Sequence, residues 1–181
     1  GCVKRHEHGL PWVLVKMAAS MDGRTAMASG QSQWVTTPAS RHDVQKLRAK
    51  SCAIITGIGT QLMDDPSLTV RITSEQLGID DVLQQPLRVV VDSQLQMSAT
   101  ARMLLQPGKT LIATLDGKSQ REKAGALIAA GAEVVFLPAH GKHVDLHALL
   151  RDLADRQCNS VMVEAGAGLA GGFIAEGLLD E

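Results

Sequence analysis

The chain has no tyrosine and only two phenylalanines and two tryptophans among its 181 residues. Proteins that hold single-stranded nucleic acid stack bases on aromatic side chains, so this composition argues against that function. An excess of one charge is also missing, because 18 basic residues are balanced by 19 acidic ones. A balanced surface has no general attraction for nucleic acid or an anionic membrane, and we expect neither as a partner.

Cysteine is scarce as well. Cys2, Cys52 and Cys158 are odd in number and widely spaced, which fits neither a disulfide framework nor a Cys-x-x-Cys zinc site. A reducing cytoplasm is therefore the expected location. No apolar run is long enough to span a bilayer, and no apolar signal region follows the charges at the start of the chain.

Length and patterning predict a single α/β domain over residues 10–181, preceded by a linker or tail at residues 1–9. Buried strands are expected at 11–18, 51–56, 87–93, 110–114, 133–137 and 160–163, and helices at 36–50, 119–130, 145–157 and 169–176. A polar segment, 73–85, is expected to be mobile. Strands that alternate with helices favour a mainly parallel sheet with helices on both faces.

The most informative motif comes late in the chain. A strand ends at Val163-Glu164, and a turn with Gly166 and Gly168 leads into a helix. The first N–H groups of a helix are unpaired and lie at the positive end of its dipole, and glycines let an anion approach them closely. The motif predicts a phosphate or pyrophosphate site. A glycine turn that serves only packing remains the alternative.

The spacing Gly166-x-Gly168-x-x-Gly171 also matches the Rossmann dinucleotide fingerprint. That fingerprint should be followed about twenty residues later by an acid on a second strand, and the chain ends before such a residue. The spacing alone therefore does not identify a Rossmann domain.

Two further patterns suggest ligands less strongly. The strand at 51–56 ends in Gly57-Ile58-Gly59-Thr60, and ligands collect at such strand ends. Asp64-Asp65-Pro66 fits a metal or general-acid pair and a simple turn equally well. His140, His143 and His147 lie beside a glycine and a lysine with no nearby cysteine, which favours a solvated loop over a metal site. No metal is expected.

Several motifs, taken in order, resemble one family. They are Lys16 to Ala26, Gly30 to Trp34, Asp64 to Arg71 and Val163 to Gly166. They are similar to the reductase domain of the RibD family of bacterial riboflavin biosynthesis proteins, and the resemblance covers nearly the whole chain. It implies a dihydrofolate-reductase-like three-layer α/β fold, usually dimeric. It also implies reduction of 5-amino-6-(5-phosphoribosylamino)uracil to 5-amino-6-(5-phosphoribitylamino)uracil with NADPH.

The chain departs from this family in two respects. Bifunctional members carry an N-terminal zinc deaminase domain, whose His-x-Glu and Pro-Cys-x-x-Cys motifs are absent here, so we expect that domain to be fused in the full-length protein. The family also continues through further strands where this sequence stops at Glu181. The resemblance therefore implies a reductase domain that is incomplete at its C-terminal end, with an incomplete sheet or dimer edge.

The resemblance also implies site residues. The cofactor positions are Ala18, Trp34, Thr60, Asp64, Ser93, Gly166, Ala167, Gly168, Leu169, Ala170, Gly171 and Gly172. The substrate positions are Ser32, Arg48, Leu68, Arg71 and Glu164. Arginines suit a sugar phosphate because guanidinium pairs bidentately with phosphate oxygens.

Chemical roles remain to be assigned. Glu164 is expected to accept hydrogen bonds from uracil N–H groups or to manage a proton, and Lys16 to donate a proton or polarise an oxygen near the reacting carbon. Trp34 packs against the nicotinamide or belongs to the core. Two other functions stay open, which are an NADPH reductase for a pteridine or folate-like ring and a non-catalytic nucleotide-binding module. The sequence does not decide between NADPH and NADH.

Overall fold

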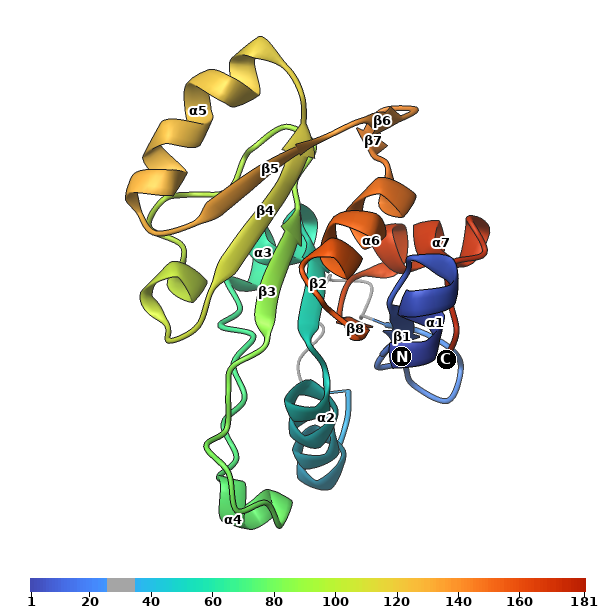
Figure 1. Ribbon diagram of the computed structural model, residues 1–181. Coiled ribbons are helices and arrows are strands. Elements are labelled where there is room, and N and C mark those ends of the chain that lie inside the picture. The colour runs from blue at the N-terminus through green and yellow to red at the C-terminus, as the bar shows by residue number, and fades with distance from the viewer. Residues whose placement is uncertain (26–34) are drawn as a thin grey trace.

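The computed structural model describes residues 1–25 and 35–181. The predicted site residues Ser32 and Trp34 lie outside the described residues, as does the rest of the motif from Gly30. One six-stranded sheet organises the chain, in the order β1-β8-β2-β3-β4-β5, and all its pairings are parallel (Figure 1). The strands are β1 (Trp12–Val15), β2 (Ala53–Gly57), β3 (Leu87–Val91), β4 (Thr110–Leu115), β5 (Glu133–Leu137) and β8 (Ser160–Val163).

Helices connect these strands. They are α1 (Cys2–His8), α2 (Pro38–Lys50), α3 (Ile58–Asp64), α4 (Ser74–Leu77), α5 (Lys118–Ala129), α6 (Leu146–Asp155), α7 (Ala167–Ala175) and the 3₁₀ helix η1 (Arg102–Leu105). A two-stranded hairpin of β6 (Ala139–His140) and β7 (His143–Val144) stands apart from the main sheet. No helix in the described ranges has the length and apolar character needed to cross a membrane.

The two faces of the sheet bury two separate cores. Val89, Leu111 and their same-face neighbours pack with Leu149 of α6 and Phe173 of α7. Alternate residues point to the other face, where Val90 and Ile112 belong to a cluster that includes Leu127 of α5. Strands buried on both faces explain the continuous apolar runs in the sequence. The predicted α/β architecture, with helices on both faces, is confirmed.

Helix starts follow the expected chemistry. The Thr37 hydroxyl accepts a hydrogen bond from the backbone N–H of Ser40 at 3.2 Å, and Pro38 occupies the first helical position of α2. Asp145 caps α6 in the same way, because its carboxylate accepts from Ala148 N–H at 2.9 Å. Side chains therefore define where these two helices begin.

Residues 1–9, which the sequence suggests are a linker or tail, contain helix α1. Arg5 Nε donates to Asn159 Oδ1 at 2.7 Å, and Lys4 pairs with Asp180. Asp180 also accepts from the N–H of Val13, at the free edge of β1. The segment is thus held by groups more than 150 residues away in the sequence, which local patterns do not reveal.

Three segments contain short elements that the sequence analysis does not predict. Gly57 is the last residue of β2, and Gly59 lies in α3, which begins at Ile58. The segment 73–85 contains α4, whose N-terminus is stabilised by a capping box of Thr73 and Gln76. Figure 1 shows α4 well away from the sheet. The histidine loop contains the β6–β7 hairpin, in which His140 and His143 are paired.

Arg88 is a charged residue inside a strand that the sequence predicts to be buried. Its side chain on β3 is only 1% exposed. The guanidinium donates to the Thr110 hydroxyl at 3.0 Å and to the carbonyls of Pro107 and Gly108 at 2.8 and 2.7 Å. Burial lowers the pKa of Arg88. The carbonyl oxygens satisfy the hydrogen-bond donors of this buried cation. The same bonds hold the turn at residues 106–108 in place.

Asp92 follows β3 with a buried carboxylate. Its Oδ2 accepts hydrogen bonds from the N–H groups of Gln96 and Met97, at 2.6 and 2.8 Å. Its Oδ1 has no hydrogen-bond partner in the described part of the chain. Burial raises the pKa of Asp92, and the backbone N–H groups oppose that shift.

The substitution Asp92→Asn tests this arrangement. The raised folded-state pKa means that Asp92 stabilises the fold when protonated, and that this contribution is lost as the pH rises above about 4. Asp92→Asn keeps an acceptor for both N–H groups and removes the buried charge. We expect a smaller fall in the free energy of unfolding between about pH 4 and about pH 7, measured by urea denaturation at each pH.

Asp92→Ala serves as the control, because it leaves both N–H groups without an acceptor. It should lower the unfolding free energy by about 1–3 kcal/mol at both pH values. Identical pH profiles for the parent chain and Asp92→Asn would contradict the assignment.

Candidate functional site

Several of the predicted site residues follow the carboxyl ends of four neighbouring strands, β1, β8, β2 and β3. Lys16 follows β1, and its N–H donates to Val163 O at 3.0 Å. Glu164 follows β8, and its N–H donates to Ile55 O at 2.9 Å. Thr60 lies in the helix after β2. Parallel strands all end at one edge, which is where α/β sheets bind ligands.

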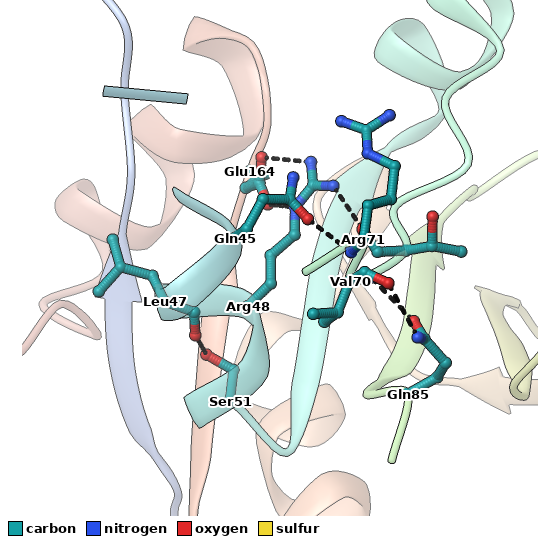
Figure 2. Close-up of polar contacts among 9 residues, drawn as sticks. Gln45, Leu47, Arg48, Ser51, Val70, Arg71, Gln85 and Glu164 are labelled. Atoms are coloured by element: carbon teal, nitrogen blue, oxygen red, sulfur yellow. Dashed lines mark hydrogen bonds and ion pairs between the residues drawn. The ribbon is translucent and has the colours of Figure 1, made fainter. Parts of the chain in front are cut away.

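Arg48 and Glu164, both predicted to contact substrate, are joined directly (Figure 2). Arg48 Nε donates to Glu164 Oε1 at 2.6 Å, and Nη2 donates to Oε2 at 3.0 Å. The two side chains are only 12% and 10% exposed. Nη1 also donates to Thr69 O at 3.0 Å. Arg48 thus links α2, the end of β8 and the segment that carries Leu68 and Arg71.

Arg71 and Leu68 lie in this segment but differ in what they present. The Arg71 side chain is exposed and forms no hydrogen bond or ion pair within the described residues. The Leu68 side chain is 5% exposed, and the residue adopts a left-handed backbone with φ 49°. The guanidinium of Arg71 is therefore accessible from outside, whereas Leu68 is not.

The predicted glycine turn is the N-terminus of α7. Gly166 is the N-cap and has no side chain to bond the first N–H groups. Ala170 N–H makes a helical bond to Gly166 O at 3.2 Å, so the N–H groups of residues 167–169 precede the helical ladder. Residues 170–172 belong to the body of the helix, and Ala170 is buried. Free donors are therefore confined to the first half of the predicted 166–172 turn.

Nothing in the fold itself requires glycine at two of these positions. A Cβ built on Gly168 would meet no atom within 4 Å, and one on Gly166 would lie 3.9 Å from the Thr60 hydroxyl. Gly166 has an ordinary φ of −70°, and Gly168 has no positive φ. These positions therefore leave room for a group outside the described chain to approach the backbone closely, although the equally open Gly125 shows that such room alone does not mark a ligand site. The N-terminus of α7 has the chemistry of an anion site, with the Thr60 hydroxyl nearby.

The two aspartates after α3 differ in their surroundings. Asp65 has a left-handed backbone at the end of α3, and its Oδ1 accepts from Gln61 Nε2 at 3.2 Å and from Arg102 N–H at 2.9 Å. These bonds support the turn interpretation for Asp65. Asp64 is exposed. In residues 1–25 and 35–181, no group of three acidic, histidine or cysteine side chains forms a metal site.

Ser93 and Ala18 complete the predicted cofactor set. The Ser93 hydroxyl accepts the N–H of Val144 at 3.1 Å, and its carbonyl accepts from Thr114 and Gln120 at 3.3 Å each. Ser93 thus ties the β6–β7 hairpin to the end of β3. Ala18 is half-buried beyond the end of β1.

Two residues that the sequence did not single out are Gln45 and Gln85. They bind the backbone of the segment that carries Arg71. Their partners lie 26 and 15 residues away, so no local pattern marks them.

The fold and this edge define a parallel α/β domain with a helix N-terminus and the Arg48–Glu164 ion pair at the carboxyl ends of its strands. The chain belongs to the RibD C-terminal domain family, whose model matches residues 11–181. It is 43% identical to the riboflavin biosynthesis protein RibD of Escherichia coli over 188 aligned residues, which cover 100% of this chain and 49% of that protein. RibD of Haemophilus influenzae is 40% identical, with 100% and 48% covered.

Solved structures give the same result. RibD of Acinetobacter baumannii superposes with a TM-score of 0.80 at 36% identity, over 98% of this chain and 46% of that one. The Saccharomyces cerevisiae riboflavin biosynthesis reductase Rib7 superposes at 0.72 with 19% identity, over 96% and 71%, and shows the shared fold alone. The chain spans about half the length of the RibD relatives it matches.

Removal of the guanidinium at Arg48 tests the ion pair. Arg48→Met leaves the carboxylate of Glu164 largely buried without its cation, so we expect a loss of about 3 kcal/mol in the free energy of unfolding. Urea denaturation measures it.

Lys46→Met, on the same helix, is the matched control. Lys46 pairs with Asp43, but the side chains are 44% and 71% exposed, so the expected loss is below about 1 kcal/mol. Equal losses in the two variants would show that the Arg48–Glu164 pair contributes no more than a surface contact.

Proposed function

We propose that this protein uses NADPH to reduce 5-amino-6-(5-phosphoribosylamino)uracil to 5-amino-6-(5-phosphoribitylamino)uracil, a step of riboflavin biosynthesis. Membership of the RibD C-terminal domain family supports the pathway. The observation that carries the cofactor assignment is the first turn of α7, where the N–H groups of residues 167–169 have no helical acceptor within the described residues and the neighbouring glycines leave room for a ligand. A pyrophosphate fits this turn.

The cofactor supplies a hydride, and the protein contributes binding and orientation. Residues 167–169 hold the pyrophosphate through their N–H groups, and Thr60 borders it. Arg71 presents to the substrate phosphate a guanidinium that has no partner within the described residues. Three of the five N–H donors of Arg48 are already used by Glu164 and Thr69, so Arg48 keeps a fixed position during binding.

Glu164 and Lys16 stand at the ends of adjacent strands, next to the region where substrate and nicotinamide meet. Held by Arg48, Glu164 offers oxygen lone pairs to uracil N–H groups. Lys16 donates a proton or polarises an oxygen near the reacting carbon. Positioning carries most of the catalysis in this scheme.

Three wider features also remain proposals. A deaminase domain fused to this one accounts for the greater length of the relatives. A homodimer follows from the family resemblance, and a cytoplasmic location follows from the few, widely spaced cysteines. The family model matches residues 11–181, and α1 precedes that range.

Gly168→Ala tests the cofactor site. A methyl group has room within the protein, and alanine favours a helix over glycine by about 1 kcal/mol, so stability should be kept or raised. The same methyl group stands where the pyrophosphate approaches. We expect the dissociation constant for NADPH, measured by calorimetric titration, to rise by at least about tenfold, and NADPH oxidation with the aminouracil to fall accordingly.

Gly125→Ala is the matched control, because Gly125 lies inside α5 and a Cβ there also meets nothing within 4 Å. It should raise stability without changing NADPH affinity. Unchanged NADPH binding in Gly168→Ala would place the cofactor elsewhere.

A further inference from the structure

The segment from Leu68 to Ile72 is buried but pairs with no strand within the described residues. Leu68, Thr69, Val70 and Ile72 are all buried, and only Arg71 is exposed. Buried backbone N–H and C=O groups need hydrogen-bond partners, which a sheet normally supplies. Here side chains bond the Thr69 carbonyl, both polar groups of Val70 and the Arg71 N–H.

Gln85 acts on Val70 as a neighbouring strand would. Its Oε1 accepts the Val70 N–H at 2.8 Å, and its Nε2 donates to the Val70 carbonyl at 3.0 Å. One amide therefore satisfies both polar groups of one residue, as Figure 2 shows.

Gln45 acts on the next residue. Its Oε1 accepts the Arg71 N–H at 2.9 Å. At 7% exposure, Gln45 is the only buried residue of α2. A helix that buries a glutamine in place of an apolar side chain indicates that the hydrogen bond, and not packing, determines the residue. Figure 2 shows Gln45 and Gln85 on either side of the segment.

Gln85 is itself held in place. A Cβ built on Gly108 would lie 2.8 Å from the Cβ of Gln85, and Gly108 has a φ of 96°. The buried Arg88 donates to the Gly108 carbonyl at 2.7 Å. Gln85 therefore packs against the turn at Gly108, which the buried Arg88 holds in place. Through its two hydrogen bonds to Val70, Gln85 connects this turn to the segment that carries Arg71.

We propose that Gln45 and Gln85 are positioning residues that fix Arg71 for the phosphate group of the substrate. The Arg71 side chain is long and has no partner within the described residues, so its position depends on the backbone that carries it. Holding that backbone in one conformation before binding lowers the entropy cost of engaging an anion. The proposal rests on the proposed function for the identity of the phosphorylated ligand.

Calorimetric titration with ribose 5-phosphate tests this role. Gln85→Met is nearly isosteric and removes both bonds to Val70, and Gln45→Met removes one bond to Arg71. Each should weaken ribose 5-phosphate binding, by about tenfold for Gln85→Met, while NADPH affinity changes by less than about twofold. Gln84→Met, at an exposed neighbouring glutamine, is the matched control and should change neither affinity.

A double-mutant cycle that combines Gln85→Met with Arg71→Met distinguishes positioning of Arg71 from general destabilisation of the fold. If Gln85 acts through Arg71, then Gln85→Met causes no further loss of ribose 5-phosphate affinity in the Arg71→Met background. Equal losses in both backgrounds, or no loss in either, would overturn the proposal. If Gln85→Met does not fold, the same cycle with Gln45→Met gives the answer.

The two proposals fail differently. A parent protein that does not bind ribose 5-phosphate would overturn the positioning role. A parent protein that binds it, loses that binding in the cycle as expected, and yet does not oxidise NADPH with the aminouracil would overturn the reductase function and leave the positioning role intact.

Discussion

The ion pair between Arg48 and Glu164 is the interaction on which the site depends. It joins a helix residue to the end of β8 across a sequence separation of 116 residues, and both side chains are largely buried. A buried charge without its partner is costly, so each residue fixes the position of the other. The third bond of Arg48, to Thr69, extends that order to the segment carrying Arg71.

Backbone pairing and side-chain hydrogen bonds each hold part of this edge of the sheet in place. The parallel sheet places strand ends in a row through regular backbone pairing, and the start of α7 presents free N–H groups there. The segment 68–72 has no such regular pairing within the described residues. Glutamine and arginine side chains bond its backbone in place of strand neighbours, and we propose that the resulting rigidity serves substrate binding.

Local signals predicted much of this architecture. Thr37-Pro38 marked the start of α2, and the β-branched runs marked the strands, because both depend on neighbouring residues. The glycine turn was found for the same reason. Long-range pairing was not predictable: α1 is held through Asn159, and the role of Gln85 appears only when residue 70 is beside it. Ser32 and Trp34 lie outside the described residues, and their predicted roles stay predictions.

The most direct measurement is a crystal structure of the protein with ribose 5-phosphate bound. The account predicts that the phosphate contacts the guanidinium of Arg71, while both hydrogen bonds between Arg48 and Glu164 persist. A phosphate that draws Arg48 away from Glu164, or one bound without Arg71, would contradict it.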